Sequence, residues 1–144
     1  MSGVVFDTSV FVQAIRRRLE ARVILDHAFP GRTYLCAVVA HELFAGTRSR
    51  EDAEAVRRLL RGFERLGSVL TPTYEDWALA GRLIEQYQRL FGQMTPSDHS
   101  HDVLIVLCAS QVRGTVVTAN LRHMEQWARL AKRAGRQVRI KAVN

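Results

Sequence analysis

The sequence predicts an α/β fold, a three-layer sandwich in which a central, mostly parallel sheet of about five short strands is flanked by helices. Short apolar runs typical of buried strands recur along the chain, and longer segments with helical periodicity separate them. The 144 residues contain no repeat, low-complexity tract or Pro/Gly/Ser linker. Strands that alternate with helices are joined by crossovers, which favours parallel pairing. We therefore expect a single domain over residues 1–144.

The expected strands are short and mostly apolar. The first is VVF at 4–6, directly before Asp7, and the last is QVRIKAV at 137–143, which we interpret as an edge strand. The strands between them are TYLCA at 33–37, SVL at 68–70 and the strand within TVVTAN at 115–120.

The expected helices fill the intervening segments. One begins with SVFVQAIRRRL at 9–19, and Thr8 or Ser9 is placed to cap its N-terminus. The clearest amphipathic helix covers 50–67, where apolar residues recur at i, i+3 and i+4. Further helices are expected at about 20–29, at 38–46, at 73–92, over the mostly buried 102–114, and at 121–135.

The composition excludes some functional classes. No apolar run approaches the roughly 18 residues that a membrane-spanning helix needs, and no export signal precedes the first strand. Cys36 and Cys108 lie in apolar segments, so we interpret them as core residues of a cytoplasmic protein rather than a disulfide.

The chain is strongly basic, with a formal net charge of +7 and a sequence pI of about 10.4. Only Lys132 and Lys141 are lysines, so arginine supplies nearly all of the positive charge. Such a pI is compatible with binding of nucleic acid. The alternative is an arginine-rich composition in which these side chains solvate helix faces.

Three acidic residues follow or border expected strands. In an open parallel sheet, ligands bind beyond the carboxyl ends of the strands, and Asp7 comes directly after the first of them. Its alternative role is to cap the next helix. Glu42 shares a helix face with Val38 and Ala45, although a position at the helix rim is also open.

Asp102 lies on the apolar stripe of a mostly buried helix, together with Ile105, Val106 and Ala109. A buried carboxylate without a partner is costly or takes up a proton, so we favour a functional role over stabilisation of the first helical turn. Asn120 follows the fourth strand and with Thr118 could line the same edge, or it could serve as a turn or N-cap residue.

Asp7, Glu42 and Asp102 come from three separate βα junctions at one edge of one sheet. Clustered carboxylates with few other partners are typical of a Mg²⁺ or Mn²⁺ site, because these hard cations take a few carboxylates and keep several waters. We therefore expect a divalent cation to neutralise the acid that follows VVF.

FDTSVF near the N-terminus, His41-Glu42-Leu43, the run that starts with Asp102-Val103 and the late Thr118-Ala119-Asn120 resemble the PIN (PilT N-terminal) domain. The likeness is strongest to the VapC-type ribonuclease toxins of bacterial toxin–antitoxin pairs and extends over essentially the whole chain. It implies an endoribonuclease dependent on Mg²⁺ or Mn²⁺, usually dimeric, which a small VapB-type antitoxin inhibits. Cleavage would leave a 5′-phosphate and a 3′-hydroxyl.

By position, Asp7, Glu42 and Asp102 match the three central acids of that family, and Ser9 matches a hydroxyl near the metal's water shell. The family's fourth acidic position falls where this sequence has Asn120 and His123, and Asp98 is a further candidate. This departure leaves open whether one or two metal ions bind. Neighbouring phosphates of the RNA would contact arginines at this edge, for which we name Arg16, Arg48, Arg50 and Arg122.

Two other functions compete with this interpretation. A phosphotransferase of the haloacid-dehalogenase type also has an Asp after its first strand, but it needs a second Asp two residues later, where Ser9 stands here. A catalytically degenerate PIN-like domain would bind RNA or a protein partner without cleavage.

The remaining histidines and aromatic residues have simpler interpretations. His99, His101 and His123 lack a second ligand pair with zinc spacing, so we expect loop-surface positions or positions behind the site. Tyr74, Trp77 and Trp127 are expected in the core or in dimer contacts.

Overall fold

The computed structural model describes residues 3–16, 32–93 and 99–143. The helix expected at about 20–29 and the candidate Asp98 lie outside these residues. A five-stranded sheet has the strand order β3-β2-β1-β4-β5, and every neighbouring pair is parallel. The predicted α/β class is therefore confirmed. The strands are β1 (Val4–Phe6), β2 (Thr33–Cys36), β3 (Val69–Leu70), β4 (Thr115–Thr118) and β5 (Arg139–Ala142).

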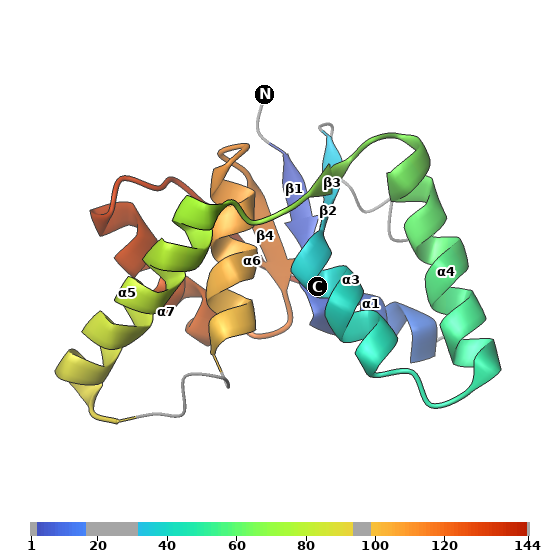
Figure 1. Ribbon diagram of the computed structural model, residues 1–144, viewed down its shortest axis with the longest axis horizontal. Coiled ribbons are helices and arrows are strands. Elements are labelled where there is room, and N and C mark those ends of the chain that lie inside the picture. Colours follow the sequence, from blue (N-terminus) through green and yellow to red (C-terminus); the bar gives the residue numbers. More distant parts are fainter. Residues whose placement is uncertain (1–2, 17–31, 94–98, 144) are drawn as a thin grey trace.

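Helices flank the sheet on both sides (Figure 1). In that view α5, α6 and α7 lie to the left of the strands, and α1, α3 and α4 lie to the right. The described helices are α1 (Thr8–Arg16), α3 (Ala37–Ala45), α4 (Arg50–Arg65), α5 (Tyr74–Phe91), α6 (Ser100–Ser110) and α7 (Leu121–Arg133).

The core is centred on β1 and α6. All three residues of β1 are at most 4% exposed, because the strand pairs with β2 on one side and with β4 on the other. In α6, the residues from Val103 to Ala109 are at most 1% exposed. A helix that is buried all round has no polar face, which explains why this segment shows almost no amphipathic period.

Local signals set most helix ends. The Ser49 hydroxyl accepts a hydrogen bond of 3.1 Å from the Asp52 backbone N–H and starts α4. Thr73 and Asp76 form a reciprocal capping box at the start of α5. Gly92 ends α5 with a φ of 95°, a backbone conformation that side chains other than glycine rarely adopt.

Three predicted boundaries were wrong by one or a few residues. The helix α1 begins at Thr8, so Asp7 precedes it and neither Thr8 nor Ser9 is its cap. Ala37, expected as the end of β2, is the first residue of α3. The helix α6 starts at Ser100 and ends at Ser110, which places Asp102 within its first turn rather than at its first residue.

The cysteines and aromatic residues are distributed only partly as expected. Cys36 and Cys108 are both fully buried free thiols, and Trp127 is 1% exposed. Tyr74 and Trp77, in contrast, lie on the surface of α5 with 84% and 57% exposure, so neither belongs to the core of this chain. No helix in the described part of the chain has the length and apolar character needed to cross a membrane.

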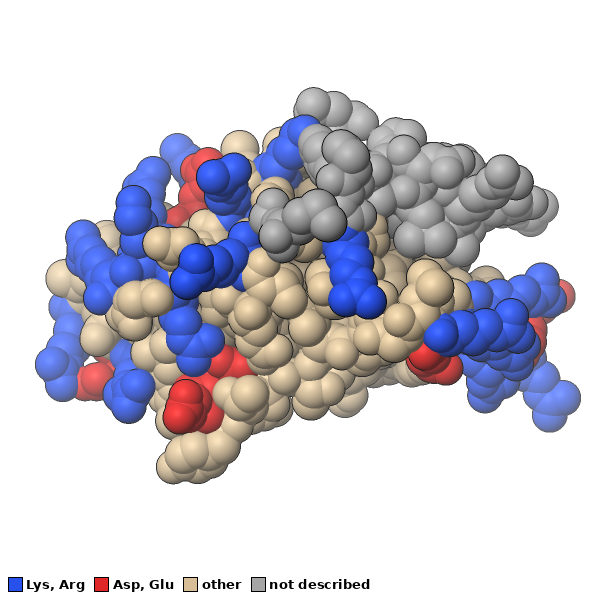
Figure 2. All heavy atoms as spheres, turned by 90° about the horizontal axis from the view of Figure 1, so that it is seen from above, with Lys and Arg blue, Asp and Glu red and all other residues tan. Residues whose placement is uncertain are grey.

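Positive charge spreads along the exposed faces of the outer helices. In Figure 2, Lys and Arg gather at the right end, where α4 lies, and at the left end, where α5 and α7 lie. The exposed basic residues of α4 are Arg50, Arg57, Arg58, Arg61 and Arg65, and those of α7 are Arg122, Arg129, Lys132 and Arg133. Many of the arginine side chains therefore lie on solvent-exposed helix faces, as the second interpretation of the basic composition predicted.

The close approach of Gly114 to Gly3 predicts an effect of substitution on stability. A Cβ atom at Gly114 would lie 2.6 Å from the Gly3 carbonyl oxygen, which accepts a 2.8 Å hydrogen bond from the Thr115 N–H. We expect Gly114→Ala to lower the free energy of unfolding, measured in urea, by about 1–3 kcal/mol. Gly62→Ala, near the C-terminal end of α4, is the control, because nothing lies within 4 Å of its Cβ position.

Gly62→Ala should stabilise the protein by up to about 1 kcal/mol, since alanine favours a helix interior over glycine. Equal effects of the two substitutions would contradict the close approach between Gly3 and Gly114.

Candidate active site

Asp7 lies at the carboxyl end of β1 with its carboxylate held in place by three hydrogen bonds. The residue is 6% exposed. Its Oδ1 accepts from the Thr8 backbone N–H at 2.7 Å, and its Oδ2 accepts from the Ser9 hydroxyl at 3.1 Å and the Thr118 hydroxyl at 2.8 Å. These bonds come from the first turn of α1 and from the end of β4. The orientation of the Asp7 carboxylate is therefore fixed by the fold.

The two hydroxyl groups also join β1 to the segment after β4. The Ser9 hydroxyl accepts a hydrogen bond of 3.2 Å from the Ala119 N–H, and the Thr118 hydroxyl accepts one of 2.9 Å from the Asn120 N–H. Each hydroxyl therefore donates a hydrogen bond to Asp7 and accepts one from a backbone N–H directly after β4. Ser9 and Thr118, both predicted as supporting residues, lie beside Asp7.

Glu42 projects from α3 toward α1 and α6. Its Oε1 accepts a 2.8 Å hydrogen bond from the Thr8 hydroxyl, and its Oε2 lies 3.5 Å from the Nδ1 of His101. The side chain is 28% exposed, which fits a position at the rim of the site better than one in the core. Glu42 thus connects the residue after Asp7 to the residue before Asp102.

The pKa of the Asp102 carboxyl depends in part on the charges of the other two acids. Burial, which is the largest cause, and the negative charges of Asp7 and Glu42 together raise the pKa of its carboxyl to about 6, while His101 acts in the opposite direction. Charges influence a pKa in this way only when they lie close together. The three predicted acids therefore gather at the same edge of the sheet, Asp7 and Glu42 after β1 and β2 and Asp102 in the first turn of α6. The expected βα junction at Asp102 was wrong, because α5 rather than a strand precedes α6.

This donor set suits a hard divalent cation. The negative charges of Asp7 and Glu42 contribute to the raised pKa of Asp102, and a cation bound among the carboxylates would relieve that contribution. Among the described residues, no three His, Cys, Asp or Glu side chains are close enough to hold one ion between them. Mg²⁺ commonly takes one or two protein carboxylates and keeps several waters, so a site with two carboxylate ligands fits this arrangement.

The position of the missing fourth acid is filled by a polar pair. The amide nitrogen of Asn120 lies 3.2 Å from the Nδ1 of His123, one turn into α7, and both residues are exposed. Asn120 thus contacts the Asp7 network through its backbone, and its side chain is engaged by His123.

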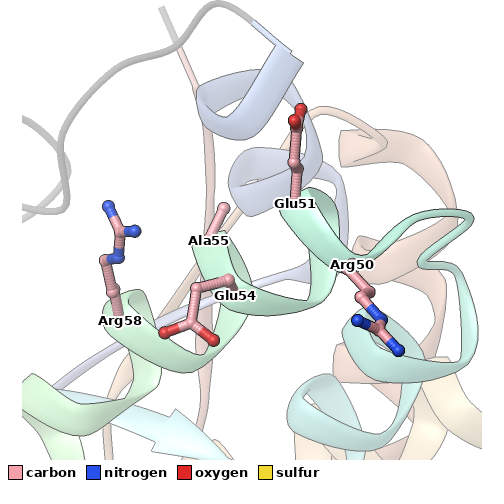
Figure 3. A pocket seen from close by; sticks show the side chains of 5 residues that line it. All are labelled: Arg50, Glu51, Glu54, Ala55 and Arg58. Carbon is pink, nitrogen blue, oxygen red and sulfur yellow. The ribbon is translucent and has the colours of Figure 1, made fainter.

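The arginines named for RNA contact are all exposed. Arg122 lies in the first turn of α7, directly after the exit of β4, and Arg16 is the last described residue of α1. Arg50 belongs to a different surface: it lines a hollow of about 460 Å³ on α4 (Figure 3). The described lining of that hollow consists of Arg50, Glu51, Glu54, Ala55 and Arg58.

Two residues of the site were not predicted as such. Thr8 was considered only as a helix cap, yet it holds both Asp7 and Glu42. His101 was interpreted as a surface histidine or one behind the site, and it lies against Glu42 and 5.7 Å from the ring of His41. The available signal was adjacency, because His41 precedes Glu42 and His101 precedes Asp102 in the sequence.

The geometry defines an α/β domain with a carboxylate cluster at the carboxyl edge of a parallel sheet. The family model of the PIN domain matches the sequence over residues 4–132. This chain belongs to the PIN domain family. No match was found among the curated proteins.

Solved structures with the same fold cover nearly the whole chain. DNA-bound VapBC from Salmonella typhimurium is 20% identical with a TM-score of 0.63, and covers 99% of this chain and 98% of its own. VapBC2 from Rickettsia felis, bound to a promoter DNA fragment, is 15% identical with a TM-score of 0.66 and 99% coverage of both chains. FitAcB from Neisseria gonorrhoeae is 18% identical with a TM-score of 0.59, and the match covers 94% of this chain and 96% of the FitAcB chain. At these identities the likeness establishes the shared fold.

The raised pKa of Asp102 predicts a pH-dependent stability. Its folded-state pKa of about 6 exceeds the ordinary value of 3.8, so the folded state holds this proton more tightly. The resulting contribution is complete below pH 4 and is lost as the pH rises through 6. Asp102→Asn removes this loss. Urea unfolding in EDTA should find the variant favoured over wild type by about 1–3 kcal/mol more at pH 7 than at pH 4.

Glu64→Gln, which replaces an exposed acid on α4, is the matched control for loss of one negative charge. The same difference between pH 7 and pH 4 in both variants would show that net charge, rather than the cluster at Asp102, sets the pH dependence.

Proposed function

We propose that this chain is a metal-dependent endoribonuclease that cleaves single-stranded regions of RNA as the toxin of a type II toxin–antitoxin pair. The observation that carries the proposal is the set of contacts that brings Asp7, Glu42 and the first turn of α6 together: Thr8 bonds to both Asp7 and Glu42, and His101, next to Asp102, lies 3.5 Å from Glu42. Membership of the PIN family supports it, because PIN domains are generally nucleases. Residues 1–144 act as one PIN-like domain, in the cytoplasm.

The residues divide the chemical work between them. Asp7 and Asp102 would hold Mg²⁺ or Mn²⁺, which when bound supplies Lewis acidity to a phosphate oxygen and lowers the pKa of a coordinated water. Ser9 and Thr118 keep the Asp7 carboxylate in one orientation through their hydrogen bonds. Glu42, held by Thr8 and His101, orients the attacking water toward the phosphorus.

A small antitoxin of the VapB type is the proposed protein partner, and the active form is a homodimer. The antitoxin partner is supported by the structural neighbours, which are VapBC and FitAcB assemblies. A protein partner that inhibits the enzyme would place cationic side chains at the carboxylate cluster or cover it. Either contact would exclude RNA and the metal ion.

A catalytically degenerate PIN domain is the second candidate. The observation that favours it is Asn120 at the place of the fourth acid, with its side chain engaged by His123. The two functions separate in one titration: a degenerate domain binds RNA but leaves it intact as Mg²⁺ or Mn²⁺ is added, whereas the nuclease begins to cleave.

Asp7→Asn and Asp102→Asn should each lower the rate of RNA cleavage by at least about a hundredfold, because each removes a charge that holds the metal. The measurement is single-turnover cleavage of a labelled single-stranded RNA in Mg²⁺, with circular dichroism to verify folding. Glu64→Gln serves again as the control and should cleave like the wild type. Undiminished cleavage by a folded Asp102→Asn variant would remove this residue from the active site.

Exposed arginines near the site predict salt-dependent binding of RNA. We expect the affinity to fall steeply with salt, and the slope of log K against log salt to shrink by about 0.7 for each phosphate contact removed. Arg122→Ala tests the edge after β4, and Arg48→Ala and Arg16→Ala test the α3–α4 loop and the end of α1. The readout is fluorescence anisotropy at several salt concentrations.

Arg65→Ala is the control, since Arg65 is the last residue of α4 and lies at the end of that helix away from Arg50. An unchanged slope for Arg16, Arg48 and Arg122 variants would show that phosphates are bound elsewhere. The same design applies to Arg50→Ala, whose side chain borders the hollow on α4.

A further inference from the structure

Five aromatic rings form a continuous cluster across three helices. The Tyr87 ring lies 4.8 Å from Phe91, 5.0 Å from Trp127 and 6.4 Å from His99 between centroids. The His99 ring lies 5.9 Å from both Trp127 and His123. The rings come from the last turns of α5, the residue before α6 and the first half of α7. We call this set the aromatic platform.

The platform has a buried floor and an exposed rim. Trp127 is 1% exposed, and its indole N–H has no hydrogen-bond partner. An unpaired buried donor is unfavourable, so ring contacts rather than a polar bond set the position of this side chain. At the rim, Phe91 is 66% exposed, and His123 also faces solvent. The Phe91 ring therefore contacts Tyr87 and still leaves most of its surface open to solvent.

The platform adjoins the carboxylate cluster. His99 directly precedes α6, one turn before Asp102, and Tyr87 stacks on it at an interplanar angle of 26°. On the other side, His123 contacts Asn120, whose backbone N–H bonds to Thr118 beside Asp7. Two separate connections therefore link the rings to the site.

We propose that the rim of the aromatic platform stacks an unpaired nucleobase of an RNA strand that is bound at the carboxylate cluster. This inference rests on the proposed function and specifies how its substrate is recognised. Every base has a π face, so aromatic stacking binds single strands with little regard to sequence. A paired base is already stacked in its helix, so the platform selects single-stranded RNA. The surrounding positive charge, including Arg122 in the same turn as His123, favours an anionic strand.

The test compares two strands that differ only in their bases. Wild-type protein is titrated, in EDTA so that no cleavage occurs, into a fluorescein-labelled RNA of about a dozen nucleotides without self-complementarity. The second strand has the same ribose-phosphate backbone with all bases removed. We expect the strand with bases to bind about 5- to 150-fold more tightly, the range that stacking of one base gives.

Substitutions at Phe91 separate stacking from packing. Phe91→Leu keeps a large apolar side chain but loses the π face. It should therefore weaken binding of the strand with bases and leave binding of the strand without bases unchanged, so that the two affinities become similar. Phe91→Trp should retain the preference. Tyr74→Leu is the matched control, since it removes an exposed ring from the opposite end of α5 and should leave the preference unchanged.

Equal binding of the two strands by the wild type would overturn the platform. So would a preference that survives both Phe91→Leu and the double variant Phe91→Leu/His123→Leu, or one that Tyr74→Leu abolishes. These outcomes leave the nuclease assignment standing, because the readout requires neither metal nor cleavage. Failure of the proposed function has a different signature: RNA remains intact in Mg²⁺ and Mn²⁺ even though the platform binds its bases.

Discussion

Burial of neighbouring carboxylates is the constraint around which this end of the protein is organised. Burial is the largest cause of the raised pKa of Asp102, and the like charges of Asp7 and Glu42 add to it. The surrounding hydrogen bonds do not remove this cost. They hold the Asp7 and Glu42 carboxylates in place through hydroxyl groups of α1 and β4. In the proposed function, a bound cation would neutralise part of this negative charge.

Much of this arrangement followed from local sequence. Apolar runs located the strands, the amphipathic period located α4, and the rule that parallel strands end at one edge brought Asp7 and Glu42 together. Asp102 follows no strand, because α6 comes after α5. Contacts between segments that are far apart in the sequence were not predicted. The Thr8 hydroxyl reaches Glu42 across 34 positions of sequence, and no periodicity encodes such a pairing. The start of α1 was misplaced because the hydroxyls that suggested a cap serve the carboxylates instead.

Charge and aromatic content illustrate the same limit. The excess of arginine was visible at once, but its division between the outer helices and the carboxylate edge depends on how α4 and α7 are placed (Figure 2). Trp127 was correctly expected in the core. Tyr87 and Phe91 gave no signal beyond a helical face, since their rings meet those of α7 and His99 only after three helices have packed.

The parallel sheet has a consequence for the order in which the chain is made. The strand β1 is the first of the sheet to be synthesised, yet its partner β4 is the fourth, and Thr118 follows Asp7 by 111 positions. A nascent chain that stops before residue 115 has neither the β4 strand beside β1 nor the Thr118 hydroxyl that bonds to Asp7. The Asp7 carboxylate therefore gains its full set of hydrogen bonds only after β4 has been made and has paired with β1.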